Sequence, residues 1–219
     1  MDVPGGPGVN FDNRQATKNW AEVDYDRSIW IPVPLSFQGT KWGDAATWAL
    51  HYASDRAQRT YGELTKKVLR KEVQPRAMSF VDARGDMVGK VPAHKIYFHF
   101  PNSNATPEPV GIGLWEPQGT REEAFQYYGY WGSRSATEQP VAEWFETEAL
   151  GRGVKAQWPG ADAEKPTWSV NYIFRNDEFE TDVHVMASSL APERLKSIIP
   201  DLDELVRRIR CVPSTISAS

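Results

Sequence analysis

The feature that most constrains the fold is a stretch near the C-terminus in which apolar and polar residues alternate on both sides of a turn signal. Residues 168–175 and 178–186 flank Asn176-Asp177, a pair suited to a two-residue hairpin turn. The apolar pairs predicted by that turn are Phe174 with Phe179, Tyr172 with Thr181, Val170 with Val183 and Trp168 with Val185. Alternation that agrees on both strands predicts an antiparallel hairpin with one apolar and one polar face.

An amphipathic helix is expected directly after this hairpin. Pro192 stands near its first turn, where a missing N–H costs nothing. Its apolar stripe is Leu195, Ile198, Ile199, Leu202, Leu205, Val206 and Ile209. Pro200 interrupts the pattern, and since an internal proline removes a hydrogen bond, we expect a kink or a restart there.

The rest of the chain mixes helical and strand periods without an internal repeat or a long linker. Helices are expected over 45–53 (with Asp44 as N-cap), 60–72, 120–128 and 140–150. Strands are expected over 29–35, 78–82, 87–91, 95–100 and 110–114, those at 78–82 and 87–91 forming a hairpin. This predicts one α+β domain, a mainly antiparallel sheet of five to seven strands packed by helices, with the C-terminal amphipathic helix.

The domain is expected to span 20–212. Residues 1–19 are rich in Gly, Pro, Asn and Asp and predict an extended N-terminal arm, and 213–219 predict a flexible tail. Strands followed by a terminal amphipathic helix are similar, at the level of architecture only, to small sheet-plus-helix domains of the Mog1/PsbP type. No sequence motif accompanies this similarity, so it implies no function.

Charge and hydropathy exclude several classes of protein. The 219 residues carry a formal charge of −4, which argues against a general nucleic-acid binder. No window approaches the roughly 20 apolar residues of a membrane span, and the first residues lack the pattern of a signal peptide. The single cysteine, Cys211, cannot form an internal disulfide. We therefore expect a cytoplasmic protein without a membrane span.

The polar face of the C-terminal hairpin is the most enzyme-like group of residues. In the predicted register Ser169 lies opposite His184 and could form a nucleophile–base pair, with Asp182 nearby, as in a small hydrolase. Alternatively, Glu180, Asp182 and His184 project from one side of a strand and could bind a divalent metal. The competing interpretation is an ordinary solvated sheet face, and no nucleotide or cofactor motif is present.

Two further groups lie on predicted helices. His51 and Asp55 stand four apart and could pair with each other or share a ligand. The helix predicted over 60–72 has a basic face, which could contact an acidic partner or simply be solvated. Its cations are Lys66, Lys67, Arg70 and Lys71, with Arg76 following.

Aromatic residues make up 12% of the chain, and several lie beside Gly or Pro. Trp115, Tyr130, Trp131 and Trp158 fall in segments expected to be loops, and Trp and Tyr are favoured at interface centres. The alternative is that these loops fold back and cap the sheet. We expect a non-enzymatic interaction or structural module, a subunit or accessory protein of an assembly, which contacts a protein partner or a second copy through these aromatic residues and the arm. The hydrolase or metal enzyme is the alternative.

Overall fold

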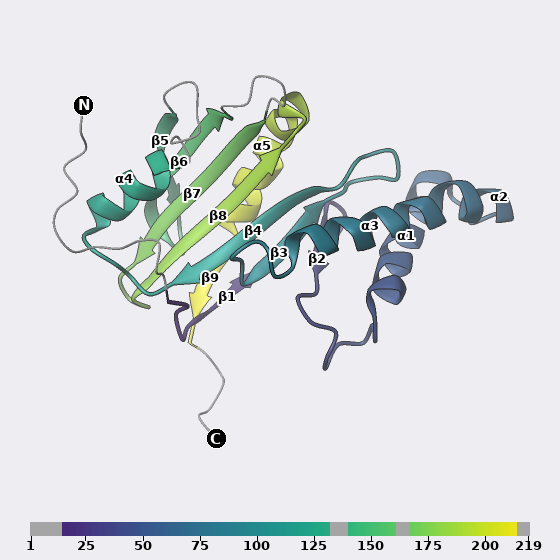
Figure 1. Cartoon of the computed structure of the whole chain (residues 1–219), viewed down its shortest axis with the longest axis horizontal. Helices are drawn as coiled ribbons and strands as arrows, with labels where there is room; N and C mark the ends of the chain where they lie inside the picture. Colours follow the sequence, from purple (N-terminus) through teal and green to yellow (C-terminus); the bar gives the residue numbers. More distant parts are fainter. Residues whose placement is uncertain (1–14, 132–139, 161–166, 214–219) are drawn as a thin grey trace. The chain divides into compact units, whose positions relative to one another are not determined.

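The computed structural model describes residues 15–131, 140–160 and 167–213, and of 129–131 the backbone alone (Figure 1). Its helices are α1 (Ala45–Tyr61), α2 (Lys66–Val68), the π-helical turn η1 (Leu69–Val73), α3 (Gln74–Met87), α4 (Arg121–Trp131) and α5 (Pro192–Arg207). Its strands are β1 (Trp20–Val23), β2 (Trp30–Val33), β3 (Lys95–His99), β4 (Glu108–Trp115), β5 (Val141–Thr147), β6 (Gly151–Pro159), β7 (Trp168–Asn176), β8 (Thr181–Ser189) and β9 (Ile209–Val212). The predicted α+β class is confirmed.

The strands form a large antiparallel sheet in the order β2-β3-β4-β8-β7-β6-β5 and a two-stranded sheet of β1 and β9. Residue contacts divide the chain into two compact units. One unit is continuous, Tyr25–Ile112. The other combines the described residues before 25 with those from Gly113 onward. Strand β4 therefore contributes its first residues to one unit and its last residues to the other.

In the unit of residues 25–112, α1 and α3 pack against each other and bury their apolar sides on β2 and β3. The core residues are Ile31, Val33, Trp48, Ala49, Ala53, Ala57, Val73, Phe80, Ile96, Phe98 and Phe100. The indole Nε1 of Trp48 donates to the carbonyl of Pro32 at 3.1 Å, which ties α1 to β2. As predicted, α1 is capped by Asp44, whose carboxylate accepts from the N–H of Thr47 at 2.7 Å.

Two predictions in this unit are wrong. The hairpin expected over 78–91 is helix α3 up to Met87, and residues 88–90 form a turn after it, because Phe80 buries one face of the helix and Gly85 stands in its solvent-exposed last turns. The second helix does not begin at 60, since α1 continues to Tyr61 and the next helical segment starts at Lys66, capped by Thr65. The basic residues predicted on one helix are therefore divided among α2, η1 and α3.

In the other unit the C-terminal hairpin is present with a different register. Its turn is four residues long, 177–180, because the side chain of Asn176 accepts from the N–H of Phe179 at 2.9 Å and Glu180 adopts a left-handed φ of 43°. The strands therefore slide by four positions, and Phe174 lies opposite Val183 instead of Phe179. A slide by an even number keeps every side chain on its predicted face.

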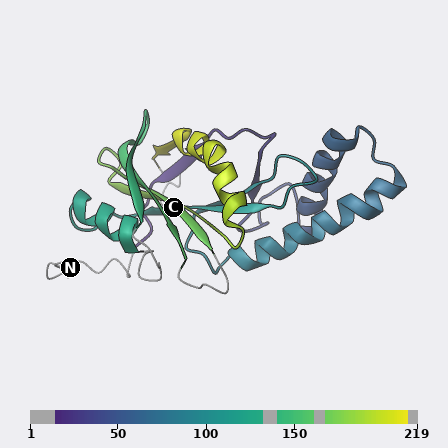
Figure 2. The same cartoon turned by 90° about the horizontal axis from the view of Figure 1, so that it is seen from above.

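Helices cover both faces of this part of the sheet (Figure 2). On one face Ile173 packs with Ala124, Phe125 and Tyr128 of α4. On the other, the Tyr172 hydroxyl donates to Asp203 of α5 at 2.5 Å. The polar face predicted to be solvated is thus the one that α4 covers.

Helix α5 is continuous, with Pro200 inside it, so of the two expected outcomes, a kink or a restart, the restart does not occur. Pro200 is exposed, and buried apolar residues of α5 precede it at Ile198 and follow it at Leu202. The helix ends at Arg207, and Ile209 belongs to β9, which pairs with β1 through Val23 opposite Ile209 and Trp20 opposite Val212.

The helix predicted over 140–150 is strand β5, and the loop predicted over 156–160 is the end of β6. The two strands pair along their length, with Val141 opposite Gln157 and Thr147 opposite Gly151. Gly151 has a φ of 73°, which allows the tight turn between them. Pairing with the adjacent strand β6, across the turn at Gly151, outweighs the helical spacing of this segment.

Candidate functional site

The aromatic residues proposed as contacts have different positions from those expected. Trp115 ends β4 and Trp158 lies in β6, and they are only 8% and 5% exposed. Gly113 makes room for the Trp115 indole, since a Cβ at 113 would lie 2.6 Å from its Nε1. The chain itself covers both rings. Tyr130 and Trp131 belong to the backbone of α4, not to a loop, and their side chains lie outside the described residues.

The end of the N-terminal arm is attached to the body of its own unit. The N–H of Thr17 donates to the carbonyl of Leu114 at 3.3 Å, and the Nδ2 of Asn19 donates to Phe179 at 2.6 Å. Residues 1–14 of the predicted arm lie outside the described residues. At least residues 15–19 are therefore engaged with this chain.

The polar hairpin residues do not form the predicted catalytic arrangement. Ser169 lies opposite Ser188, with the two hydroxyl oxygens 3.1 Å apart, whereas His184 lies opposite Ile173. His184 and Ser188 are four residues apart on one strand, so Ser169 is displaced along the hairpin by about 13 Å from His184. A direct proton transfer between these two side chains is impossible in this register.

Asp182 has a structural partner. Its two carboxylate oxygens accept from Nε and Nη2 of Arg175 at 2.7 and 2.8 Å, and the pair is buried. Arg175 also donates to the carbonyls of Gln118 and Gly119, so the pair holds the segment before α4. The hydrogen bonding of Arg175 to the Asp182 carboxylate is the first cause of the raised pKa of Arg175.

The predicted metal ligands are likewise separated by their environments. Glu180 is exposed in the turn, Asp182 pairs with Arg175, and the His184 ring packs against Tyr128 at 5.2 Å. Over residues 15–131, 140–160 and 167–213 no three His, Cys, Asp or Glu side chains gather in a way that could hold a metal ion.

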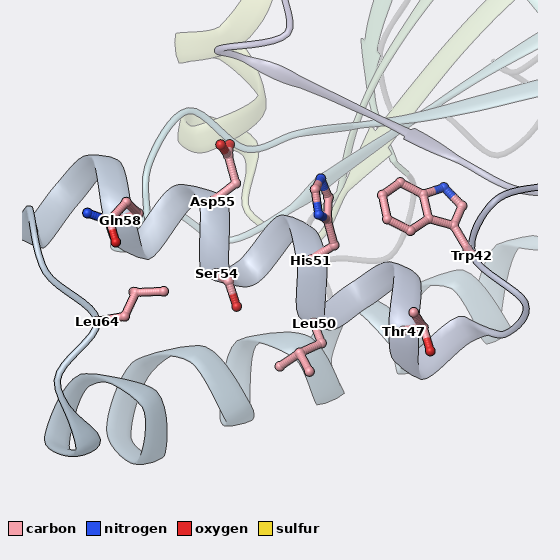
Figure 3. Close-up of a pocket in the computed structure, with 8 residues that line it drawn as sticks. All are labelled: Trp42, Thr47, Leu50, His51, Ser54, Asp55, Gln58 and Leu64. Atoms are coloured by element: carbon pink, nitrogen blue, oxygen red, sulfur yellow. The ribbon is translucent and has the colours of Figure 1, made fainter.

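An open groove of about 600 Å³ lies on α1 (Figure 3). We call it the α1 groove. It is lined by Trp42, Thr47, Leu50, His51, Ser54, Asp55, Gln58 and Leu64. The residues from 47 to 58 recur at intervals of three and four, so they share one side of the helix. The opposite side of α1 is already buried in the core.

Aromatic rings form the N-terminal end of the α1 groove. The Trp42 ring lies 4.5 Å from His51 and 5.6 Å from Tyr52, between centroids. The Lys41 ammonium stands 4.3 Å above the Trp42 ring, a cation–π contact. Burial raises the pKa of Tyr52 to about 12, so this phenol remains neutral at physiological pH. The cluster presents an aromatic surface for apolar contacts at this end of the groove.

Asp55 is the one acidic residue in the lining, and its charge is compensated. It accepts from Nη1 of Arg56 at 2.6 Å and from Nε of Arg59 at 3.0 Å. The pairing of His51 with Asp55 considered from their spacing is replaced by these two ion pairs and by a tilted ring contact of His51 with Trp42. The groove thus offers apolar surface at Leu50 and Leu64 and hydroxyl or amide groups between them.

Sequence reasoning missed the groove as a site. Trp48 and Tyr52, four residues apart, indicate the apolar side of the helix in the sequence, but Leu50 on the other side is 48% exposed. The available signal was an apolar residue on the polar side, two positions from a core tryptophan. Its partners Trp42 and Leu64 flank the helix, and only the fold brings them beside it.

Fold and surface together define an α+β protein with an open groove on α1, in which the predicted Ser169, Asp182 and His184 are not brought together. No family model matches the sequence, and no curated protein matches it. Among solved structures it is similar to a point mutant of the protein Mog1 (17% identity, TM-score 0.41, covering 55% of this chain and 80% of that chain). It is also similar to the Saccharomyces cerevisiae Ran-binding protein Mog1p (16% identity, TM-score 0.41, 57% and 82% covered). Similarity at this level transfers neither family nor residue roles. No helix within the described ranges is long and apolar enough to cross a membrane.

Proposed function

We propose that this chain is a non-enzymatic protein-interaction module that receives a segment of a partner in the α1 groove. The observation that carries this proposal is Leu50, which stands half-exposed on the side of α1 that faces away from the core, between Trp42 and Leu64. Apolar side chains gathered in an uncovered groove are typical of protein contacts. The groove replaces the buried rings of Trp115 and Trp158 as the proposed contact surface.

The dimensions of the groove favour a peptide segment. From Thr47 to Gln58 the lining extends over eleven helical steps, or about 16 Å. A partner helix of about three turns can lay its apolar face along that length, with anchors at positions i, i+3, i+4 and i+7. Serine, threonine and glutamine between the apolar ends supply hydrogen bonds at the rim.

Site-specific photo-crosslinking tests the proposal. A photoreactive residue at position 50 should give discrete crosslinked products in an extract of the source cells, and one at exposed Met78 of α3, which is not part of the lining, should not. Leu50→Asp should weaken recovery of the same partner at least tenfold, because it replaces the apolar contact with an uncompensated charge. Met78→Asp, the same change at an exposed apolar residue outside the groove, is the matched control. Equal crosslinking at 50 and 78, or undiminished recovery with folded Leu50→Asp, would contradict the proposal.

A further inference from the structure

Four exposed cations follow the α1 groove directly, and we call them the basic tip. They are Lys66 and Lys67 of α2 and Arg70 and Lys71 of η1. Among the described residues none of the four has an ion-pair partner. Arg76 is not part of the tip, since it donates to the carbonyl of Ser103 at 2.8 Å and lies over the Phe100 ring.

The basic tip is a local concentration of positive charge in an acidic protein. Residues 25–112 carry 12 Lys and Arg against 8 Asp and Glu, a formal charge of +4. The rest of the chain carries 13 against 21, a formal charge of −8. A third of the cations of residues 25–112 therefore stand within six positions, which makes the tip the natural contact for a negatively charged ligand.

The basic tip and the α1 groove are continuous. Leu64 lines the end of the groove, and Lys66 begins α2 two residues later, after the capping residue Thr65. Figure 3 shows the chain turning from Leu64 at the end of α1 into the next helical segment. η1 is a π-helical turn, a conformation frequent at functional sites, and it leaves Leu69 37% exposed among the cations. One ligand can therefore touch the apolar lining and the cations together.

We propose, as a deepening of the proposed function and resting on it, that the partner segment is acidic: an amphipathic helix with an apolar stripe for the α1 groove and carboxylates for the basic tip. Carboxylates on such a helix would complement the four unpaired cations. The α1 groove supplies the apolar contact, and the basic tip orients the bound partner helix and raises the rate at which it associates.

A short acidic segment fits better than an extended polyanion. A nucleic acid or an anionic bilayer presents negative charge over many Debye lengths, and the part of this chain outside 25–112 carries a formal charge of −8 that opposes it. A short helix can confine its carboxylates to the tip. A phosphate backbone would also leave the apolar lining around Leu50 without a partner.

Two synthetic peptides test the proposal on the full chain. Each is a fluorescein-labelled peptide of about 12 residues, held helical by a side-chain staple, with Leu at i, i+3, i+4 and i+7, and the remaining positions are Glu in one peptide and Lys in the other. Fluorescence anisotropy should show the Glu peptide binding at least tenfold more tightly than the Lys peptide at about 50 mM salt, with the preference shrinking at about 500 mM. The double variant K66E/K67E of the protein should bind the Glu peptide about tenfold more weakly. The control is Lys90→Glu, which should leave the affinity for the Glu peptide unchanged, because Lys90 lies outside the basic tip and is paired with Asp86.

The outcomes separate this proposal from the proposed function. Equal binding of the two peptides, or no saturable binding of the Glu peptide, overturns the acidic partner. Tighter binding to phosphatidylcholine–phosphatidylserine vesicles or to a single-stranded oligonucleotide, unaffected by Leu50→Asp, also overturns it. If Leu50→Asp still abolishes crosslinking of the cellular partner in those cases, the groove function stands. If Leu50→Asp alters neither assay, both proposals fail.

Discussion

Asp203 on α5 anchors a buried charge, and its removal should be among the most destabilising single changes in this chain. Its carboxylate accepts from the Tyr172 hydroxyl at 2.5 Å and from the Lys155 ammonium at 2.9 Å, and the Lys155 side chain is only 6% exposed. Breaking a buried ion pair costs about 3–5 kcal/mol. Asp203 is 20% exposed and Glu143 remains 3.5 Å from the ammonium, so we expect the lower end, about 3 kcal/mol.

Chemical and thermal denaturation followed by circular dichroism measure this loss in Asp203→Ala. For a chain of this size about 3 kcal/mol corresponds to a fall in Tm of about 6–12 °C. Glu204→Ala is the control, because Glu204 makes an exposed ion pair with Arg208 on the same helix and should cost about 0.3–0.5 kcal/mol. Replacing both members, Lys155→Met with Asp203→Leu, should restore most of the stability. A loss no greater than that of Glu204→Ala would refute the buried network.

Three further predictions concern stability. Arg56→Ala should cost about 2–3 kcal/mol in urea unfolding, because its buried guanidinium donates to two backbone carbonyls that would lose their partner, and a loss below about 0.5 kcal/mol would contradict this. Gly153→Ala should be strongly destabilising, since the new Cβ would collide with a neighbouring backbone carbonyl. Gly85→Ala, where a Cβ meets open space in α3, should instead stabilise the protein by about 0.5–1 kcal/mol. If the two substitutions change the stability in the same direction, this prediction is refuted. Burial raises the pKa of Cys211 to about 11 and of Tyr52 to about 12, so at alkaline pH the native state keeps protons that the unfolded chain releases. The urea midpoint of unfolding should therefore stay constant up to about pH 9 and fall from there toward pH 12. A midpoint that rises over this range would contradict the burial of these two groups.

Elements with a strong period were predictable from the sequence. The faces of the C-terminal hairpin follow from strict alternation, and α5 follows from the stripe that begins at Leu195. The cross-strand partners were not predictable, because the hydrogen bond that the Asn176 side chain accepts from Phe179 and the left-handed Glu180 lengthen the turn by two residues. Periodicity gives the face of a side chain, whereas turn chemistry gives its neighbour.

Segments with weak or mixed patterns were misassigned for a related reason. Gly85 resembles a turn residue, but at the exposed end of α3 its cost is only about 1 kcal/mol, which the burial of Phe80 offsets. Residues 141–147 have helical spacing, and their pairing with β6 decides for a strand. The groove was unpredictable for the same reason, since Trp42 and Leu64 are brought to α1 by loops without a periodic signal.

The pairing of β1 with β9 has a consequence for how the chain is made. The partners Trp20 and Val212 are separated by almost the whole sequence, with the continuous unit of residues 25–112 inserted between them. During synthesis that inserted unit leaves the ribosome complete, while β1 must wait until residues 209–212 emerge. The backbone N–H and C=O groups of β1 therefore stay unpaired throughout elongation. An unpaired strand of this kind can associate with other nascent chains until β9 emerges and pairs with it.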